Sequence, residues 1–300
     1  MADGELIFDT KINATGFTKG IGKLGDLAKK SVAGIAAATA AASTAISALA
    51  KQATSCYADY EQLIGGVETL FKSSADKVEK YASEAFKNVG MSGNEYMETV
   101  TGFAASLISS LGNDTDAAAE KANMALTDMS DNANKMGSDL ESIKNAYAGF
   151  SKQNYTMLDN LKLGYGGTKE EMQRLLDKAK EIQKTKFGVD VDYDISSFAD
   201  IVDAIHVIQT EMDITGTTAK EASTTISGSI SAMKAAWTDL MTGVADPTQD
   251  FDRLLGNVVD SVVTVADNLA PRIAAVLPQM ADGLTKLTND LLPLIRETIN

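Results

Sequence analysis

The chain has 300 residues, of which 44% are hydrophobic, 23% are charged and only 6% are aromatic. Much of the apolar content is alanine, which buries far less apolar surface than an aromatic side chain, so the composition favours thin helix-on-helix contacts over one thick core. The formal net charge of -14 excludes nucleic-acid binding by simple charge attraction, because phosphate binding depends on clustered lysine and arginine. The sequence holds no such cluster, and no sequence-specific nucleic-acid binding is expected.

The use of cysteine and proline further limits the kinds of protein that the sequence can encode. Cys56 is the single cysteine, which rules out an intrachain disulfide and is compatible with a reducing compartment such as bacterial cytoplasm. Three of the four prolines lie in the last tenth of the chain, so no proline before Pro247 interrupts a helix. The first residues are acidic and no apolar run follows a basic start, so the sequence predicts no signal peptide.

Residues 1–26 predict an extended N-terminal arm. The segment GELIFDTKIN, residues 4–13, contains the β-favouring pair Ile7 and Phe8 among polar neighbours. Four glycines follow before residue 26, and each lowers helix stability by about 1 kcal/mol relative to alanine. A secure helix is therefore expected only after Gly25.

Residues 27–60 predict an alanine-rich helix. Its stretch from Ser31 to Ala50 carries no charge and is flanked by lysines. At 1.5 Å per residue this stretch is roughly 30 Å long, which is enough to cross a bilayer, but alanine, serine, threonine and glycine supply little hydrophobicity. A small-residue stripe for close helix packing is the favoured interpretation, and a membrane span stays the alternative.

Residues 61–243 predict a multi-helix core region. Apolar residues recur there at helical spacing, and several breaks carry the capping box, in which a hydroxyl and a carboxylate three residues later satisfy free backbone amides. The expected fold class is therefore all-α, with long and medium helices joined by short Gly/Asn/Asp turns in an elongated or bundled arrangement. The expected breaks are at Gly65-Gly66 and at residues 88–93, 112–115, 137, 164–168, 188–196, 216–218 and 243–248, and the capping pairs are Ser92 with Glu95, Ser138 with Glu141, Thr168 with Glu171, and Thr218 with Glu221.

Residues 244–300 predict an apolar C-terminal helical segment. From Phe251 onward, valines and leucines form a band wider than a two-position stripe, so the segment is expected to pack between neighbours or to lie near lipid. No strict heptad persists in the chain, although a coiled-coil-like seam between copies is the simplest way to bundle them. The apolar pattern is still running at Asn300, which predicts that the final helix continues beyond the chain end or finishes against a partner.

Two short motifs resemble known ligand-binding sequences. GYGGT at residues 164–168 places glycines before a helix start, where amides can hold a phosphate, but the Lys-Ser/Thr ending of a P-loop is missing. A turn followed by a cap at Thr168 is the better interpretation. Asp190, Asp192 and Asp194 form a DxDxD run, yet isoleucines stand where a calcium loop needs glycine and glutamate. A solvated acidic loop is favoured.

The remaining candidates are isolated. His206 is the only histidine and lies far from Cys56 in sequence, so neither a metal cluster nor a Cys-His pair is indicated. Glu61 and Glu68 are interpreted as cap or surface residues, because a glycosidase pair needs an aromatic-lined groove. Trp237 lies in a helical stripe typical of packing, with a partner contact as the minority interpretation. We predict no catalytic, cofactor or metal site, and the chain is not expected to be an enzyme.

Four long strings carry a family resemblance. They are YEQLIGGVETLFKSSADKV at residues 60–78, NEYMETVTGFAASLISSLGND at 94–114, MSDNANKMGSDLESIKNAYAGFSKQNYTMLDNLKLGYGGTKEEMQRLL at 129–176 and ISSFADIVDAIHVIQTEMDITGTTAKEASTTISGSISAMKAAW at 195–237. In wording and order they resemble the tape measure proteins of long-tailed phages of Gram-positive hosts. The opening GELIFDTKINATGF is similar to the usual N-terminus of that family, so the resemblance extends over nearly the whole chain.

This resemblance implies a structural role in the virion. Such proteins lie in the lumen of the tail tube, set its length during assembly and leave ahead of the DNA at genome ejection. The implied partners are the tail tube protein, tail assembly chaperones, tail tip or baseplate proteins and sister copies, with host membrane contact on ejection. The implied locations are the virion, the host cytoplasm during assembly and the host membrane.

Length separates this chain from the family pattern. A fully helical chain of 300 residues reaches only roughly 450 Å, and family members are generally much longer, so an N-terminal portion of a longer ruler is expected. In some relatives the later regions carry wall-degrading domains. The alternative function is a membrane-active translocator or pore-forming helical protein, motivated by the uncharged stretch at residues 31–50 and the apolar C-terminal segment.

Overall fold

The computed structural model describes residues 39–246 and 248–273, and within these ranges the protein is all-α and contains no strand. The fold class expected from the sequence is confirmed. The elements are α2 (Thr39–Phe71), the 3-10 turn η1 (Lys72–Ser74), α3 (Ala75–Asn88), α4 (Gly93–Ser110), α5 (Thr115–Met136), α6 (Leu140–Phe150), the 3-10 turn η2 (Leu158–Leu161), α7 (Lys169–Ile182), the π-helical turn η3 (Gln183–Phe187), α8 (Phe198–Glu211), α9 (Thr217–Thr224) and α10 (Ile226–Ala245), followed by a helix over residues 251–273.

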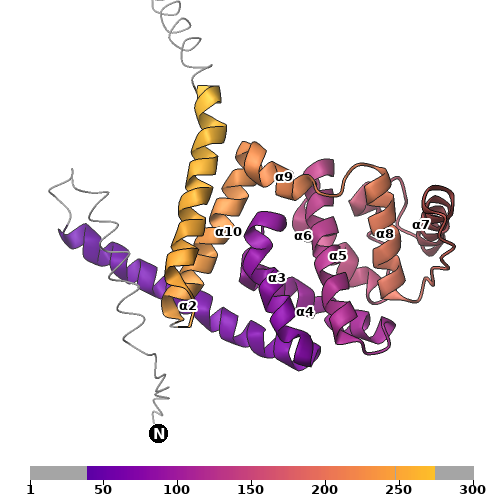
Figure 1. The fold of residues 1–300 in the computed structure, drawn as a ribbon, viewed down its shortest axis with the longest axis horizontal. Helices are drawn as coiled ribbons and strands as arrows, with labels where there is room; N and C mark the ends of the chain where they lie inside the picture. The colour runs from indigo at the N-terminus through magenta and orange to yellow at the C-terminus, as the bar shows by residue number, and fades with distance from the viewer. Residues whose placement is uncertain (1–38, 247, 274–300) are drawn as a thin grey trace, which may run out of the picture.

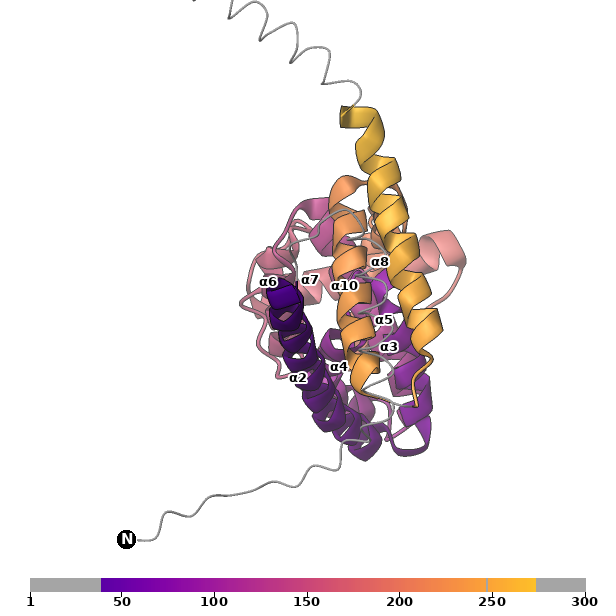
Figure 2. The ribbon, with the colours of Figure 1, turned by 90° about the vertical axis from the view of Figure 1, so that its left-hand side faces the viewer.

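Helix α5 lies at the centre of the molecule and contacts α3, α4, α6, α8 and α9. Figure 1 shows α7 and α8 at one end of the long axis, while α2, α10 and the helix of residues 251–273 lie toward the other end. Turned by 90°, Figure 2 places these three helices together on the face toward the viewer. We call α2, α10 and residues 251–273 the outer layer.

Two apolar clusters hold the bundle together. The main core surrounds α5 and contains large buried side chains from α2 to α8, among them Phe71, Leu126 and Phe150. The smaller cluster joins the three helices of the outer layer to Phe86 of α3 and combines three alanines with larger side chains such as Leu240, Met241 and Leu254. Apolar burial is therefore concentrated around α5 and is thin in the outer layer.

Helix α7 illustrates how spacing selects the buried face. Met172, Leu175, Leu176 and Ala179 recur at helical spacing, and all four are buried against the main core. The other positions of this helix are mostly charged and face solvent. The helical spacing found in the sequence is confirmed here, because one apolar stripe on a 3.6-residue period suffices to dock the helix.

Two of the expected N-terminal caps are present. The Ser92 hydroxyl accepts a hydrogen bond from the backbone N–H of Glu95 at 3.3 Å and caps α4. At the start of α7, the Thr168 hydroxyl accepts from the backbone N–H of Glu171 at 3.2 Å. Each hydroxyl satisfies one of the free amides at a helix start, which fixes where the helix begins.

The other two expected caps are wrong. Helix α6 is capped by Asp139, which accepts from the backbone of its first turn, while the neighbouring Ser138 hydroxyl donates to the carbonyl of Asn160 instead. Helix α9 begins at Thr217, so Thr218 lies inside it, and its backbone N–H donates to Asp131 of α5 at 2.7 Å. In both places a carboxylate takes the role that the sequence pattern gave to a hydroxyl.

The expected break at Gly65 and Gly66 is also wrong, because α2 runs through both glycines to Phe71. Val67 and Phe71 are fully buried in the main core. Burying them stabilises the helix by about 1.5–3 kcal/mol each, which outweighs a cost of about 1 kcal/mol for each glycine. A Cβ at Gly66 would lie 3.7 Å from Thr101 in α4, which is an ordinary contact distance, so the packing of α2 on α4 does not require glycine there. The expected boundary between residues 60 and 61 therefore falls within one helix.

The turn after α10 agrees with the break expected near residues 243–248. Helix α10 ends at Ala245, and Asp246 accepts from the backbone N–H of Thr248 at 2.9 Å. Asp250 then accepts from the backbone N–H of Arg253 at 3.1 Å at the start of the next helix. The expected arm of residues 1–26, the first part of the alanine-rich helix and residues 274–300 lie outside the described residues.

Candidate functional site

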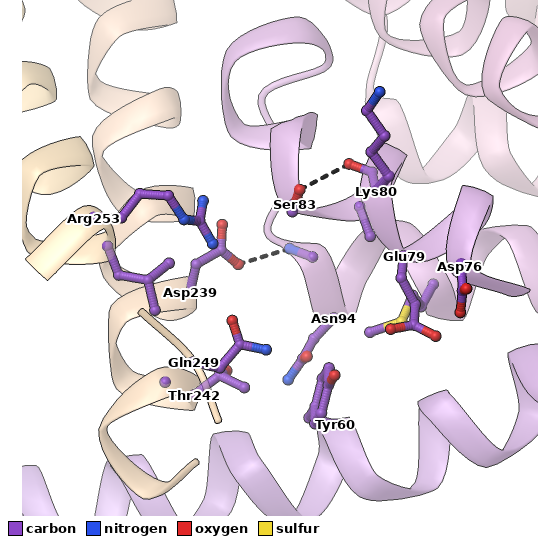
Figure 3. A pocket seen from close by; sticks show the side chains of 15 residues that line it. Tyr60, Asp76, Glu79, Lys80, Ser83, Asn94, Asp239, Thr242, Gln249 and Arg253 are labelled. Carbon is purple, nitrogen blue, oxygen red and sulfur yellow. Dashed lines mark hydrogen bonds between the residues drawn. The ribbon is translucent and has the colours of Figure 1, made fainter. Parts of the chain in front are cut away.

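A pocket of about 300 Å³ lies where the outer layer meets α3 and the start of α4. Figure 3 shows Asp239 and Arg253 on one side of this pocket, Asp76 and Glu79 on the other, and Asn94 between them. The lining therefore comes from segments far apart in the chain, joined only by tertiary packing. Each side presents charged groups to the same pocket, whose lining also includes apolar residues such as Met97 and Leu254.

Asp239 links α10 to the first turn of α4. One of its carboxylate oxygens accepts a hydrogen bond from the backbone N–H of Gly93 at 2.7 Å. Burial raises the pKa of Asp239 to about 7, although the Gly93 N–H and the nearby charge of Arg253 both favour the ionised form. This carboxyl group therefore exchanges its proton near neutral pH.

The opposite side of the pocket is acidic. Burial raises the pKa of Glu79, and the carboxylates of Asp76 and Glu68 raise it further. Burial also raises the pKa of Tyr60 to about 12, with Glu79 adding to the shift, so the phenol remains a protonated hydrogen-bond donor. Among the described residues no ion pair neutralises Asp76 or Glu79.

The pocket brings carboxylates together with the Asn94 amide and the Tyr60 phenol. Within residues 39–246 and 248–273, no group of three His, Cys, Asp or Glu residues is arranged to hold a metal ion. Cys56 lies close by, since its carbonyl accepts a hydrogen bond from the Asn94 amide at 2.8 Å. Burial, Asp59 and Asp239 all raise the pKa of the Cys56 thiol, which keeps it protonated and weakly nucleophilic.

A second polar feature lies inside the main core, on α5. Asp131 is fully buried and accepts hydrogen bonds from the backbone N–H groups of Gly216 at 2.6 Å and Thr218 at 2.7 Å. These are free amides at the start of α9, so a core carboxylate caps a helix distant in sequence. The connection fixes α9 against α5.

Asp128 lies one turn earlier on α5 and is also fully buried. Its carboxylate contacts Nδ1 of His206 in α8 at 2.9 Å. Burial raises the pKa of Asp128 to about 6 despite the opposing effect of His206, and the hydrogen bond to Asp128 raises the pKa of His206. The only histidine of the chain thus joins α8 to α5 through a pair in which Asp128 is buried and His206 is partly exposed.

Other buried polar atoms on these helices have no hydrogen-bond partner within the described residues. They belong to Ser130 and Asn132 of α5, Tyr147 of α6 and both ends of the Gln209 amide in α8. Each such atom costs about 1–3 kcal/mol in an apolar interior. The sequence does not predict this polar feature, because the apolar residues of α5 form one ordinary stripe and its polar residues look solvent-exposed.

The helix of residues 251–273 has a third notable feature, an uncovered apolar surface. Leu254, Val258 and Ser261 are buried on the side that faces α10. An adjacent face carries exposed side chains with no cover from the described part of the chain. We call this face the apolar stripe; it comprises Val259, Val262, Val263, Ala266, Leu269, Ala270 and Ile273.

The three aspartates of the DxDxD run do not converge on one point. Asp192 pairs with Lys180 of α7, and Asp194 accepts from the backbone N–H of Ser196 at 2.8 Å. Their carboxylates are therefore engaged by a lysine or by the loop backbone. The interpretation as a solvated acidic loop fits this arrangement.

The other sequence candidates do not line the pocket. In the GYGGT loop, the N–H of Gly166 donates to the carboxylate of Glu171 at 3.0 Å, so a side chain of α7 occupies the amide. Glu61 and Glu68 are exposed on α2. Trp237 is partly buried and packs against the smaller cluster, as expected for a packing residue.

No protein-family model, curated protein or solved structure matches this chain. Among the helices that the structure describes, none combines the length and the apolar content needed to cross a membrane.

Proposed function

We propose that this protein is a structural tail protein of the tape measure kind, which sets the length of a phage tail tube and is released ahead of the DNA. The observation that carries the proposal is the resemblance of four long strings between residues 60 and 237. These strings cover the end of α2, the start of α3, nearly all of α4, the last part of α5, all of α6, α8 and α9, and the first parts of α7 and α10. The resemblance thus extends over one folded unit.

Two structural features support a role in assembly. The described residues form a helical bundle without a metal-binding group, and the last described helix presents an apolar stripe that the bundle leaves uncovered. Exposed apolar surface of this extent is typical of a site that meets another chain. The proposed partners are the tail tube protein, tail assembly chaperones, tail tip or baseplate proteins and sister copies.

The proposed locations follow from the same role. The protein acts in the host cytoplasm during assembly and in the lumen of the tail tube in the finished virion. Contact with the host membrane is proposed for the moment of ejection. A net charge of -14 suits a chain that must leave a narrow tube without binding the DNA behind it.

Tail length in the phage or prophage that encodes the chain tests this function. Removing residues 39–273 in frame would shorten a fully helical ruler by roughly 350 Å, and duplicating the same residues in tandem would lengthen it by a similar amount. Electron microscopy of negatively stained particles measures both changes. The matched control is Leu126→Ala, which weakens the main core without altering chain length and should leave the length of assembled tails unchanged.

Opposite shifts of tail length in the deletion and the duplication would support the ruler. Unchanged length in both variants, or absence of the protein from purified tails by mass spectrometry, would overturn it. Deletion of α5 alone is a poorer experiment, because α5 contacts most of the main core and its loss would unfold the bundle.

The alternative is a membrane-active translocator, which the exposed valines of the apolar stripe favour. Apolar residues on one helix face can insert into the boundary between lipid headgroups and acyl chains. Release of an encapsulated dye from liposomes tests it. Leakage with the purified chain, lost in Val262→Ser with Leu269→Ser, would support this role, whereas intact liposomes would exclude it.

A further inference from the structure

We infer that the apolar stripe is a seam between two copies of this chain, which pair through the helix of residues 251–273 as a parallel two-stranded coiled coil. The inference rests on the proposed function in that sister copies are among its partners, and it names the surface through which they meet. Four observations carry it: the spacing of the stripe, its exposure, the position of nearby charges and the types of residue at the seam.

The stripe follows the alternating three- and four-residue spacing of a coiled coil. Val259, Val262, Ala266, Leu269 and Ile273 are separated by three, four, three and four residues, and all are exposed. No strict heptad persists over the chain, but this shorter repeat is visible on the side of the helix that α10 does not bury. The same spacing continues in the sequence at Val276 and Met280.

Among the apolar side chains of this helix, those of the stripe are exposed and those that face α10 are buried or partly buried. Val259, Val262 and Ile273 retain 49%, 48% and 47% of their accessible surface, whereas Leu254 and Val258 on the α10 side retain 6% and 8%. Further along the same side, the Asn268 amide donates to the carbonyl of Thr225 at 3.2 Å. The bundle therefore uses one side of this helix and leaves the adjacent apolar side for another chain.

Charge placement lets two acidic chains approach along this face. Each copy carries a net charge of -14, so association elsewhere brings carboxylates together. The positions that flank the seam on one side are Gly256, Val263 and Ala270, none of which is charged. Asp260 and Asp267 lie beyond them, on the solvent side of the helix. The stripe is thus a part of the surface where two copies can pack without opposing carboxylates.

Residue types at the seam indicate a parallel pair. In heptad terms, Val259, Ala266 and Ile273 share one core position, and Val262 and Leu269 share the other. Val259 and Ile273 at the first position and Leu269 at the second follow the pattern of two-stranded parallel coiled coils, whereas Ala266 and Val262 depart from it. From residue 259 to residue 273 the seam is about 21 Å long, which is short, so a weak and concentration-dependent dimer is expected.

Light scattering after size-exclusion chromatography of the full 300-residue chain tests the seam. We expect the mass to rise from 31.7 kDa toward twice that value, over concentrations of about 1 to 100 µM. Val262→Ser with Leu269→Ser should abolish the rise. The matched control, Asp260→Ser with Asp267→Ser on the same helix, should preserve it, because these carboxylates lie outside the seam.

Each contrary result overturns the inference. A monomer at every concentration means that copies do not pair, and a persisting dimer in the stripe variant places the contact elsewhere. A mass of three or more chains excludes a two-stranded seam. Circular dichroism of each variant confirms that the helices are intact, so that loss of the dimer is not loss of the fold.

Chain orientation is tested by disulfide crosslinking in a Cys56→Ser background. Ile273→Cys places a thiol at a core position that meets its own counterpart only in a parallel pair, so mild oxidation should crosslink the dimer. Asp267→Cys on the solvent side should not crosslink. Absence of the Ile273→Cys crosslink in a dimeric sample would exclude the parallel arrangement.

These measurements are independent of tail length. A monomeric protein whose deletion and duplication still change tail length would overturn the seam and leave the proposed function standing. A dimeric protein that has no effect on tail length would overturn the proposed function and leave the seam.

Discussion

The main core around α5 and the outer layer formed by α2, α10 and residues 251–273 are both helical, yet they are stabilised to different degrees. Around α5, large side chains such as Leu126, Tyr147 and Phe150 are fully buried and contact several helices. In the outer layer the smaller cluster has fewer buried side chains, and it includes alanines such as Ala53 and Ala235 alongside Leu240, Met241 and Leu254. A buried leucine or aromatic stabilises the fold far more than a buried alanine.

This difference shows how one chain can combine a stable core with an exposed apolar surface. Small residues allow helices to approach closely, but they remove little apolar surface from water. The outer layer therefore closes one side of the bundle while leaving the apolar stripe exposed. The main core, in contrast, has enough apolar burial to hold the polar groups of α5 in its interior.

The largest expected effect is in the main core. Leu126→Ala should lower the free energy of unfolding by about 4 kcal/mol, because Leu126 is fully buried and the cavity cannot close. Leu254→Ala in the outer layer should cost about 2 kcal/mol. Urea denaturation followed by circular dichroism measures both, and equal losses would remove the distinction between the two regions.

The next largest effect on stability is expected for the pair formed by Asp128 of α5 and His206 of α8. His206→Leu leaves the Asp128 carboxyl group unpaired in the core and should cost about 3 kcal/mol at pH 7. Adding Asp128→Asn to this variant removes the unpaired charge and should restore part of the loss. If the loss of unfolding free energy in the double variant equals or exceeds the sum of the losses in the two single variants, the pair is not coupled in this way.

Asp239 predicts a dependence of stability on pH. Its pKa is raised to about 7 by burial, so between pH 4 and pH 7 the folded protein holds a proton that the unfolded chain releases. The stability that this proton confers is lost as the pH rises through about 7. Asp239→Asn keeps an acceptor for Gly93 and should gain about 1–2 kcal/mol relative to the natural protein at pH 8, but not at pH 5.

Thermal melts at pH 5 and pH 8 measure this gain. Asp59→Asn, an exposed aspartate on α2, is the control and should show no gain that depends on pH. A constant difference between Asp239→Asn and the natural protein at both pH values would contradict the burial of this carboxyl group.

A smaller effect is expected where α10 meets the next helix. A Cβ at Gly243 would lie 2.2 Å from the side chain of Leu254, so Gly243→Ala must displace that flexible side chain. We expect a loss of about 1 kcal/mol, with faster hydrogen exchange in residues 251–273. Gly102→Ala on α4 is the control, because nothing lies within 4 Å of the added methyl group and alanine favours helix. That control should be slightly stabilising.

The smallest effect on folding is expected at the apolar stripe. Val262 is exposed, so Val262→Ser should change the unfolding free energy of the monomer by no more than about 0.5 kcal/mol. Chemical denaturation at low micromolar concentration measures it. A loss as large as that of Leu254→Ala would mean that the stripe belongs to the internal packing of the outer layer.

Local chemistry made much of the helical pattern predictable. The breaks near residues 88–93, 112–115 and 137 fall between helices as expected, because glycine and asparagine there end one helix and a polar cap begins the next. Ser92 and Thr168 cap helices as predicted. These features depend on residues a few positions apart, so the sequence contains all the information they need.

Features that depend on distant partners were not predictable in this way. Gly65 and Gly66 stay helical because Phe71 is buried, and Asp131 is tolerated in the core because the start of α9 supplies its hydrogen bonds. The pocket around Asp239 likewise joins α10 to α4. No pattern within a single helix shows which of its polar residues will meet such a partner.

By itself, the sequence determined the helical class, most helix ends and the apolar stripes, since these follow from local propensity and the helical period. Tertiary structure alone decided which stripes are covered. Leu254 and Val262 look alike in the sequence, yet α10 buries the first and leaves the second exposed. The physical reason is that burial depends on the surface of neighbouring helices, which the periodicity of one helix does not encode.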